Sequence, residues 1–177
     1  MSGISTDEVT ARLRSLQDIE EIKRLKHAYF RCIDTANIEE LHGIMHENVY
    51  TCYVGGTYRI ELTDRVQFLE MIASAFHSET VARHNGHHPE IEILSDSEAR
   101  GIWYLHDVFI NLRLMTRTEG TALYRDRYRK IDGLWRITEQ TYERIYEIVE
   151  PLSERPSLRT HYLASHGRKL PRKEPTL

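Results

Sequence analysis

Apolar side chains in the first part of the chain recur at steps of three and four residues, the spacing of one face of an α-helix. This spacing predicts a long helix over Thr6–Asp34 and a short one over Ile38–Met45. Asp64 can cap a third helix that runs to about His77. The apolar face of the long helix consists of Ile22, Leu25, Tyr29, Cys32 and Ile33.

Later in the chain, apolar and polar positions alternate as they do in β-strands. Gly55-Gly56 marks one hairpin turn, and Asp132-Gly133 marks a second. Gly86 is expected to interrupt the strand that begins at Val81. The predicted strands are Val49–Val54, Tyr58–Ile60, Val81–His84, Glu90–Leu94, Ala99–Asn111, Thr121–Ile131 and Leu134–Val149.

The apolar positions of the last strand change parity along its length. Trp135 and Ile137 fall on odd positions, whereas Tyr142 and Tyr146 fall on even ones. A β-bulge inserts one extra residue, so it would return all four side chains to one face of the sheet. We therefore expect a bulge between Ile137 and Tyr142.

Helices come first, interleaved with one hairpin, and long strands follow. This segregation predicts the α+β class, with helices packed against one face of a curved antiparallel or mixed sheet. We expect one domain, 1–150, and a polar tail, 151–177. The end of the tail should be solvated and mobile, and its basic residues are Arg168, Lys169, Arg172 and Lys173.

The 177 residues carry a net charge of −3, and 40% of them are hydrophobic, an ordinary balance for a globular protein. Positive and negative residues are interspersed, so the pattern does not favour binding to nucleic acid or to an anionic membrane. No apolar stretch is long enough for a membrane span or resembles a signal peptide. We expect a soluble cytoplasmic protein in which Cys32 and Cys52 are reduced.

The informative residues are polar ones at positions where the pattern expects apolar ones. Asp107 lies between Leu105 and Phe109 on one strand face, where a carboxylate is costly unless it is paired or faces a wet cavity. Trp103 and Asn111 share that face and are therefore candidates for contact with a substrate. Because the opposite face is apolar as well, an exposed or salt-bridged Asp107 is the alternative interpretation.

Asp34, near the end of the long helix, opposes the helix dipole, so a histidine or an arginine should compensate it unless it is exposed. Tyr29 lies about 140° away around the helix, so the two share a pocket only if the pocket wraps the helix or the helix changes there. The alternative for Tyr29 is a core tyrosine.

Arg144 shares a strand face with Tyr142, a further candidate for substrate contact. The alternative for Arg144 is a surface arginine whose stem covers aromatic rings.

The stretch from His84 to His88 contains three histidines. Gly86 and Pro89 prevent the regular helix that would align them, and no HExxH motif is present, so we expect no metal site. A single histidine acting as a base is the better interpretation, because its pKa suits proton transfer near neutral pH. No dinucleotide-binding, P-loop or nucleophile-elbow motif occurs.

Seven stretches of the chain, in order, match a family pattern. They are Asp18–Lys26, Tyr29–Asp34, His84–His87, Pro89–Ile91, Trp103–Asp107, Tyr128–Trp135 and Tyr142–Ile145. Through them the sequence resembles the SnoaL-like branch of the nuclear-transport-factor-2-like superfamily, and within it the bile acid 7α-dehydratases. His106 departs from that pattern because it stands where those enzymes have an acidic residue, and residues 111–118 differ as well.

The resemblance implies a cone-shaped sheet that encloses a deep apolar pocket together with three helices. It also implies a homotrimer, with a dimer as the alternative, and a dehydratase that uses neither cofactor nor metal. Tyr53 falls on a substrate-contacting position. The residues on catalytic positions are Tyr29, Asp34, His84, Asp107 and Arg144.

The expected function is elimination of water from a hydrophobic, polycyclic, steroid-like hydroxy-carbonyl compound. His84 would remove the proton, Asp34 would orient the imidazole, and Tyr29 would donate a hydrogen bond to the enolate oxygen or to the leaving group. Asp107 would hold the substrate or assist the leaving hydroxyl, and Arg144 would keep the carboxylates ionised. The alternatives are an isomerase, a polyketide cyclase, a dehydrohalogenase, an epoxide hydrolase or a non-catalytic small subunit of a ring-hydroxylating dioxygenase.

Overall fold

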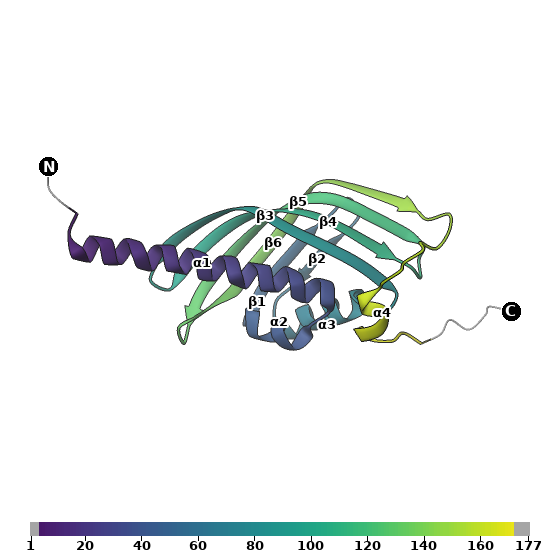
Figure 1. The fold of residues 1–177 in the computed structure, drawn as a ribbon, viewed down its shortest axis with the longest axis horizontal. Helices are drawn as coiled ribbons and strands as arrows, with labels where there is room; N and C mark the ends of the chain where they lie inside the picture. Colours follow the sequence, from purple (N-terminus) through teal and green to yellow (C-terminus); the bar gives the residue numbers. More distant parts are fainter. Residues whose placement is uncertain (1–3, 172–177) are drawn as a thin grey trace.

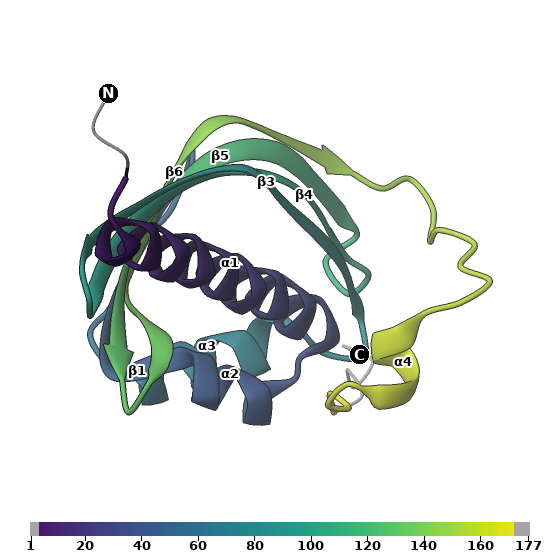
Figure 2. The same cartoon turned by 60° about the vertical axis from the view of Figure 1, so that its left-hand side comes forward.

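The computed structural model describes residues 4–171, and its helices lie on the concave side of one six-stranded sheet. The sheet curls around the longest helix without closing (Figures 1 and 2), which confirms the predicted α+β class. The strand order is β2-β1-β6-β5-β4-β3, and all neighbours are antiparallel except the parallel pair β1–β6. The strands are β1 Met45–Val54, β2 Arg59–Leu62, β3 Thr80–Ser95, β4 Glu98–Asn111, β5 Thr116–Ile131 and β6 Leu134–Pro151.

The first and third helices begin at side chains that cap them. Ser5 accepts a hydrogen bond from the backbone N–H of Glu8 at 3.2 Å. Asp64 accepts one from the backbone N–H of Gln67 at 2.9 Å, which confirms the predicted cap. The helices are α1 Thr6–Thr35, α2 Ile38–Ile44, α3 Arg65–Ala75 and α4 Tyr162–His166.

The side of α1 that faces the sheet carries a charged residue among its apolar ones. Lys26 is 0% exposed, and its Nζ lies 2.7 Å from Asp126 Oδ2 on β5. The same Nζ lies 3.9 Å from the ring centre of Tyr124. Burial lowers the pKa of Lys26, and the charge of Asp126 opposes that shift. The ion pair therefore ties the middle of α1 to the inner face of the sheet.

β3 is one continuous strand, so the predicted interruption at Gly86 is wrong. β3 is the edge strand of the sheet, where a glycine is tolerated. Gly86 is also required by packing, since a Cβ at this position would overlap the ring of Phe30 on α1. The irregularity comes later, where the register shifts between His87 and Glu90 and where His88 has a φ of 49°.

β6 contains two bulges in its pairing with β5. Thr138 is the extra residue of the first bulge, so the bulge predicted between Ile137 and Tyr142 is confirmed. Ile145 is the extra residue of the second bulge, which the sequence pattern did not predict. Each bulge reverses the face on which the following side chains lie. The second one thereby turns Glu147 toward the concave side, where it contacts Arg144.

The segment after Pro151 returns to the domain, although its sequence suggested only a polar tail. α4 lies within this segment, and Leu163 is 2% exposed because it packs into the core. The Nε2 atom of His161 lies 2.8 Å from the backbone oxygen of Thr80 at the start of β3. These contacts attach the segment to the end of the molecule where β3 begins.

Three further expectations concern cysteines, the basic tail and membranes. Cys32 and Cys52 are buried and are not joined in a disulfide. Arg172 and Lys173 lie outside the described residues. Within residues 4–171, no helix has the length and apolar character needed to cross a membrane.

Candidate functional site

The inner face of the sheet is built of rows of residues that are register partners on neighbouring strands. Asp107 on β4 lies between His84 on β3 and Gly120 on β5. Two rows further along the strands lies a row of aromatic side chains, beneath the row that contains His84 and Asp107. This aromatic row consists of Tyr53, Tyr142, Tyr124 and Trp103.

Asp34 at the end of α1 holds His84 through both carboxylate oxygens. His84 Nδ1 lies 2.6 Å from Asp34 Oδ1, and the backbone N–H of His84 donates to Asp34 Oδ2 at 3.0 Å. The imidazole packs against Phe30 and Phe76, with ring centres 6.5 and 5.7 Å away. Asp34 thus fixes the position of the ring and leaves Nε2 for another partner. His84 is the compensating group that the position of Asp34 at a helix end predicted.

Asp107 and Arg144 form a second buried pair beside His84. Arg144 Nη2 donates to Asp107 Oδ2 at 2.9 Å, and Nη1 donates to Oδ1, which makes the pair bidentate. Asp107 is 3% exposed. Burial lowers the pKa of Arg144, but the hydrogen bonds and the charge of Asp107 outweigh burial and raise this pKa above its usual value. Asp107 is therefore salt-bridged and also directed toward the concave side.

Arg144 reaches Asp107 across β5 at a position that has no side chain. Gly120 is the register partner of Asp107. A Cβ on Gly120 would stand 3.3 Å from Arg144 Nη1 and 2.5 Å from the backbone oxygen of Tyr146. Gly120 therefore leaves the space in which the guanidinium passes from β6 to β4.

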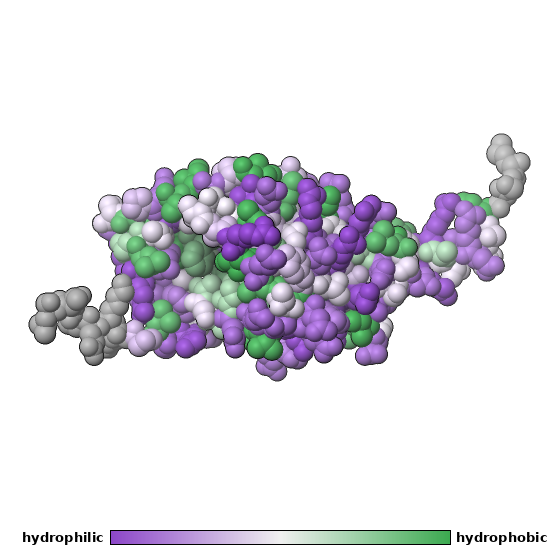
Figure 3. Space-filling view, turned by 180° about the vertical axis from the view of Figure 1, so that it is seen from behind, coloured by the Kyte–Doolittle hydropathy of each residue, from purple (hydrophilic) through white to green (hydrophobic). Residues whose placement is uncertain are grey.

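His84, Asp107 and Arg144 line one cavity of about 300 Å³, at the lower end of the usual range for small-molecule sites. The cavity reaches solvent beside Thr57 and Val149, which are both exposed. In the view from behind, the surface is hollowed toward the end that carries the C-terminus, and apolar side chains show inside the hollow (Figure 3). Other side chains of the cavity wall are Tyr58, Phe76, Phe109, Tyr142 and Glu147.

Tyr29 is not among the residues of this cavity wall. The ring of Phe30 lies next to both Tyr29 and His84, with ring centres 5.4 and 6.5 Å away. Tyr29 is 2% exposed, and its ring packs edge-on against Tyr124. Burial raises the pKa of Tyr29, and the neighbouring Tyr124 adds to the shift. The interpretation as a core tyrosine describes Tyr29, because it and Asp34 leave α1 in different directions.

Tyr142 lines the cavity, whereas Tyr53 lies behind it. The hydroxyls of Tyr142 and Tyr58 are 2.5 Å apart at the cavity wall. The Tyr53 ring stacks on the Tyr142 ring at 4.7 Å, and the Tyr53 hydroxyl donates to Gln140 Oε1 at 2.6 Å. Burial raises the pKa of Tyr142, so its phenol stays protonated at neutral pH.

Two residues expected to contact a substrate serve the framework in this structure. Trp103 is fully buried, and its Nε1 donates to the hydroxyl of Tyr128 at 2.9 Å. Asn111 Oδ1 accepts from the backbone N–H groups of Arg113 and Leu114, at 3.0 and 2.9 Å, and thereby stabilises the turn between β4 and β5. Neither residue belongs to the cavity wall, because the strand face that both share with Asp107 extends beyond the cavity at each end.

Tyr58 and Glu147 belong to the cavity wall although the sequence analysis did not select them. Tyr58 directly precedes β2, and its hydroxyl reaches back to that of Tyr142. Glu147 faces inward only because of the bulge at Ile145. The alternation of the sequence gives no sign of that second bulge, so only the strand register reveals it.

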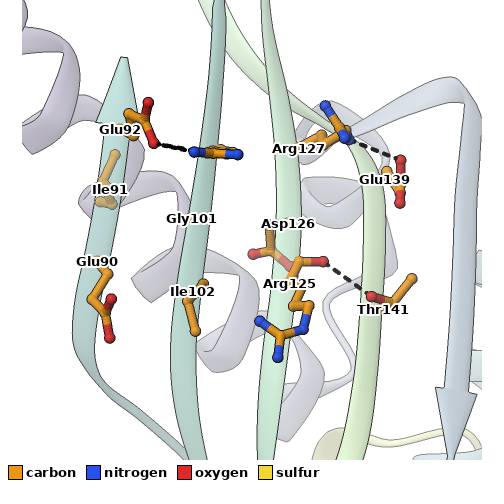
Figure 4. Close-up of a pocket in the computed structure, with 11 residues that line it drawn as sticks. Glu90, Ile91, Glu92, Gly101, Ile102, Arg125, Asp126, Arg127, Glu139 and Thr141 are labelled. Carbon is orange, nitrogen blue, oxygen red and sulfur yellow. Dashed lines mark hydrogen bonds and ion pairs between the residues drawn. The ribbon is translucent and has the colours of Figure 1, made fainter. Parts of the chain in front are cut away.

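A larger groove of about 610 Å³ lies on the sheet face that the helices do not cover (Figure 4). Exposed ion pairs cross its strands, with Arg100 2.6 Å from Glu92 and Arg127 3.3 Å from Glu139. None of the candidate catalytic residues lines this groove. The smaller inner cavity, whose wall contains His84, Asp107 and Arg144, is therefore the better candidate for the functional site.

The histidine-rich stretch does not converge on an ion-binding geometry. Within residues 4–171, no group of three or more His, Cys, Asp or Glu side chains is arranged to hold a metal ion. His87 and His88 contact each other through their Nδ1 atoms, 2.7 Å apart, on an exposed part of β3. The side chains at the cavity include the imidazole of His84, the phenols of Tyr58 and Tyr142, and the Asp107–Arg144 ion pair.

Residues 14–141 match the family model of the SnoaL-like domain. The chain belongs to the SnoaL-like family. This match covers most of α1, all of α2 and α3 and most of the sheet, and so it includes Asp34, His84 and Asp107. The family that the sequence resembles is thereby confirmed.

Solved structures share the SnoaL-like fold of this chain at low sequence identity. A scytalone dehydratase-like protein from Novosphingobium aromaticivorans is 18% identical, with a TM-score of 0.66 over 91% of this chain and 98% of that one. A type 2 hexachlorocyclohexane dehydrochlorinase is 16% identical, with a TM-score of 0.69 over 84% and 98%. A protein from N. aromaticivorans with a cystatin-like fold is 18% identical, with a TM-score of 0.65 over 81% and 92%.

Proposed function

We propose that this SnoaL-like protein is a cofactor-independent lyase that eliminates water from a hydrophobic hydroxy-carbonyl compound. The observation that carries the proposal is the imidazole of His84, which Asp34 holds at 2.6 Å on the wall of a partly apolar cavity. A partly buried histidine with a carboxylate on one nitrogen is a positioned base. The Asp107–Arg144 pair lies beside it.

In the proposed reaction His84 acts first as a base and then as an acid. Nδ1–H donates to Asp34, so Nε2 takes the proton from the carbon next to the one that bears the hydroxyl, which is acidic because it is activated by the carbonyl directly or through an enone. The electron pair of the broken C–H bond forms an enolate, and Asp34 stabilises the imidazolium. When the enolate expels the hydroxyl group, the imidazolium returns the proton to it, and the products are water and the unsaturated carbonyl compound.

The other residues of the cavity wall stabilise and orient the substrate in this mechanism. Tyr58 or Tyr142 donates a hydrogen bond to the enolate oxygen, the role that the resemblance assigned to Tyr29. Asp107 accepts a hydrogen bond from the substrate hydroxyl, while Arg144 holds Asp107 in place through two hydrogen bonds. General acid–base catalysis contributes about 10²–10⁴-fold, so orientation in the cavity must supply much of the remaining acceleration.

The proposed substrate is a polycyclic, steroid-like alcohol with a carbonyl group in conjugation. A bicyclic part of such a compound suits the cavity of about 300 Å³, and the rest would extend past Thr57 and Val149. Phe76 and Phe109 give the cavity aromatic surface that favours ring systems. We also propose that the protein works in the cytoplasm as a homotrimer, with a dimer as the alternative.

A 7α-hydroxy-4-en-3-one steroid tests this function directly. Loss of water would extend the conjugation of the enone to a dienone, so we expect a new absorption band at longer wavelength in the presence of the protein. The His84→Ala variant should lack this activity. Substrate that stays unchanged over the range of neutral pH would contradict the proposed dehydration of this steroid class.

Elimination of hydrogen chloride is the second candidate, since one of the similar structures is a hexachlorocyclohexane dehydrochlorinase. That reaction needs the same base but no proton for the leaving group, and a pair such as His84–Asp34 would suffice. Chloride release from hexachlorocyclohexane, without activity on the hydroxy-enone, would favour it. A non-catalytic subunit has no need for a carboxylate-held imidazole at a cavity wall, so the structure favours an enzyme.

A further inference from the structure

Glu147 is the charged residue of the cavity wall to which the proposed mechanism assigns no role. The bulge at Ile145 places Arg144 and Glu147 on the same face of β6, so both side chains enter the concave side. The side chain of Glu147 is 11% exposed, and its Oε1 lies 3.2 Å from Arg144 Nε. Its Oε2 points toward the β1–β2 turn, 3.6 Å from where a Cβ on Gly56 would stand. Glu147 therefore brings a second carboxylate to the cavity wall next to Asp107.

The charge of Arg144 is already shared among its protein partners. Nη1 and Nη2 donate to Asp107. Nε lies 3.2 Å from Glu147 Oε1 and donates to the Tyr58 hydroxyl at 3.4 Å. All three nitrogens of the guanidinium are thus engaged, and two carboxylates face a single cation. His84 with Asp34 adds a further negative charge whenever the imidazole is neutral.

We propose that Glu147 is a substrate-binding residue that selects uncharged ligands able to donate a hydrogen bond and that excludes carboxylates. This inference rests on the proposed function, because it describes the substrate of the same cavity. A hydroxyl group donates to Glu147 or Asp107 at low cost, since each carboxylate can accept several hydrogen bonds. Glu147 thereby sets how a hydroxy-carbonyl compound lies in the cavity: the alcohol end lies at the carboxylates of Asp107 and Glu147, and the carbonyl end lies toward the hydroxyls of Tyr58 and Tyr142.

A ligand that carries a carboxylate is disfavoured at the same position. Its carboxylate would lose water on entry and would find Asp107 and Glu147 at the cavity wall, while the guanidinium of Arg144 is already engaged. Desolvating a charge without a new partner is costly, and bringing like charges together adds to that cost. An arginine in a cavity often indicates an acid-binding site, but the two carboxylates around Arg144 reverse that expectation here.

Binding of 2-naphthol and 2-naphthoate to the full chain tests the inference, because the two compounds share one ring system and differ in charge at pH 7. Isothermal titration calorimetry measures both affinities for the unaltered protein and for the Glu147→Gln and Glu150→Gln variants. Glu150 is a matched control, since it lies three residues beyond Glu147 on the same strand and pairs with Arg117 on the exposed side. Thermal unfolding shows whether each variant is folded.

We expect 2-naphthol to bind the unaltered protein about ten-fold or more tightly than 2-naphthoate. Glu147→Gln should reduce this ratio several-fold, and Glu150→Gln should leave it unchanged. Equal affinity for the two compounds overturns the inference, as does an unchanged ratio in a folded Glu147→Gln variant. If Glu147→Gln does not fold, the ratio of the two affinities for the unaltered protein still tests the inference.

The same experiment separates this inference from the proposed function. Discrimination between the two compounds without any dehydration of the hydroxy-enone supports the role of Glu147 and counts against the dehydratase. Dehydration without discrimination supports the dehydratase and refutes the role of Glu147. Failure of both naphthalene compounds to bind overturns the inference about Glu147, whereas the assay with the hydroxy-enone alone decides the proposed function.

Discussion

Asp34 shows how far a single residue can be interpreted from sequence. A carboxylate in the last turn of a helix needs a partner, and His84 occupies that place at 2.6 Å. Tyr29 and Trp103 show the limit of such reasoning. Periodicity gives the face on which a side chain lies, but the depth of a side chain within the core depends on packing between α1 and the sheet. Both residues lie in the core and not at the cavity wall.

Gly120→Ala tests the space through which Arg144 reaches Asp107. The added Cβ would stand 2.5 Å from the backbone oxygen of Tyr146, so the strand or the guanidinium must move. We expect dehydration of the hydroxy-enone to fall by up to about 10²-fold and the free energy of unfolding to fall by about 1–3 kcal/mol. Activity assays and urea denaturation measure the two effects.

Gly43→Ala is the matched control for this substitution. Gly43 lies in α2, and a Cβ there would meet nothing within 4 Å. Alanine in a helix is favoured over glycine by about 1 kcal/mol, so this variant should keep its activity and gain slightly in stability. Equal behaviour of the Gly120 and Gly43 variants would show that Arg144 does not need the gap at Gly120.

At the scale of elements, β6 determines which polar residues reach the cavity. The bulge at Thr138 could be predicted because apolar residues flank it and change parity. The bulge at Ile145 could not, since Tyr146 and Ile148 after it are half exposed and give no apolar face to follow. The position of Glu147 therefore depends on strand register, which the sequence pattern does not specify at an exposed strand end.

The contact between α1 and β5 depends on the buried pair of Lys26 and Asp126. Asp126→Asn would leave the Lys26 ammonium without its counter-ion, so we expect the free energy of unfolding to fall by about 3–5 kcal/mol. Glu8→Gln, which removes the exposed partner of Arg12, should change it by no more than about 1 kcal/mol. Urea denaturation at neutral pH provides the comparison.

The double variant Lys26→Met with Asp126→Leu separates charge from packing. Replacing both charges by apolar side chains of similar size should restore most of the lost stability, because no buried charge then remains. A double variant as unstable as Asp126→Asn alone would show that the pair contributes through shape and not through charge compensation.

At the scale of the whole molecule, the order of helices and strands was enough to predict the α+β class. Long segments in which apolar residues recur with the period of a helix or of a strand indicate that element. The cavity could not be predicted in this way. Its wall combines side chains from the residue that follows α3, the β1–β2 connection and four strands, and their meeting depends on the curvature of the sheet. The return of the last segment was also missed, because its few apolar residues, Leu163 among them, are spread through a polar stretch without the period of a helix or a strand.

Leu163→Ala tests whether the last segment is part of the folded domain. Leu163 is 2% exposed in the core, so its truncation should cost about 2–5 kcal/mol of unfolding free energy. Leu158→Ala, at a position 38% exposed, should cost no more than about 0.5 kcal/mol. Thermal unfolding distinguishes the two variants, and equal midpoints would mean that the segment is not anchored in solution.

Chemical rescue of His84→Ala by imidazole is the most direct measurement of the proposed chemistry. Loss of the base should lower the rate of dienone formation from the hydroxy-enone by about 10²–10⁴-fold. Added imidazole should restore part of that rate, because the cavity beside Asp34 would then admit a free base. A His84→Ala variant that forms the dienone at nearly the rate of the unaltered protein, with or without imidazole, would contradict His84 as the base.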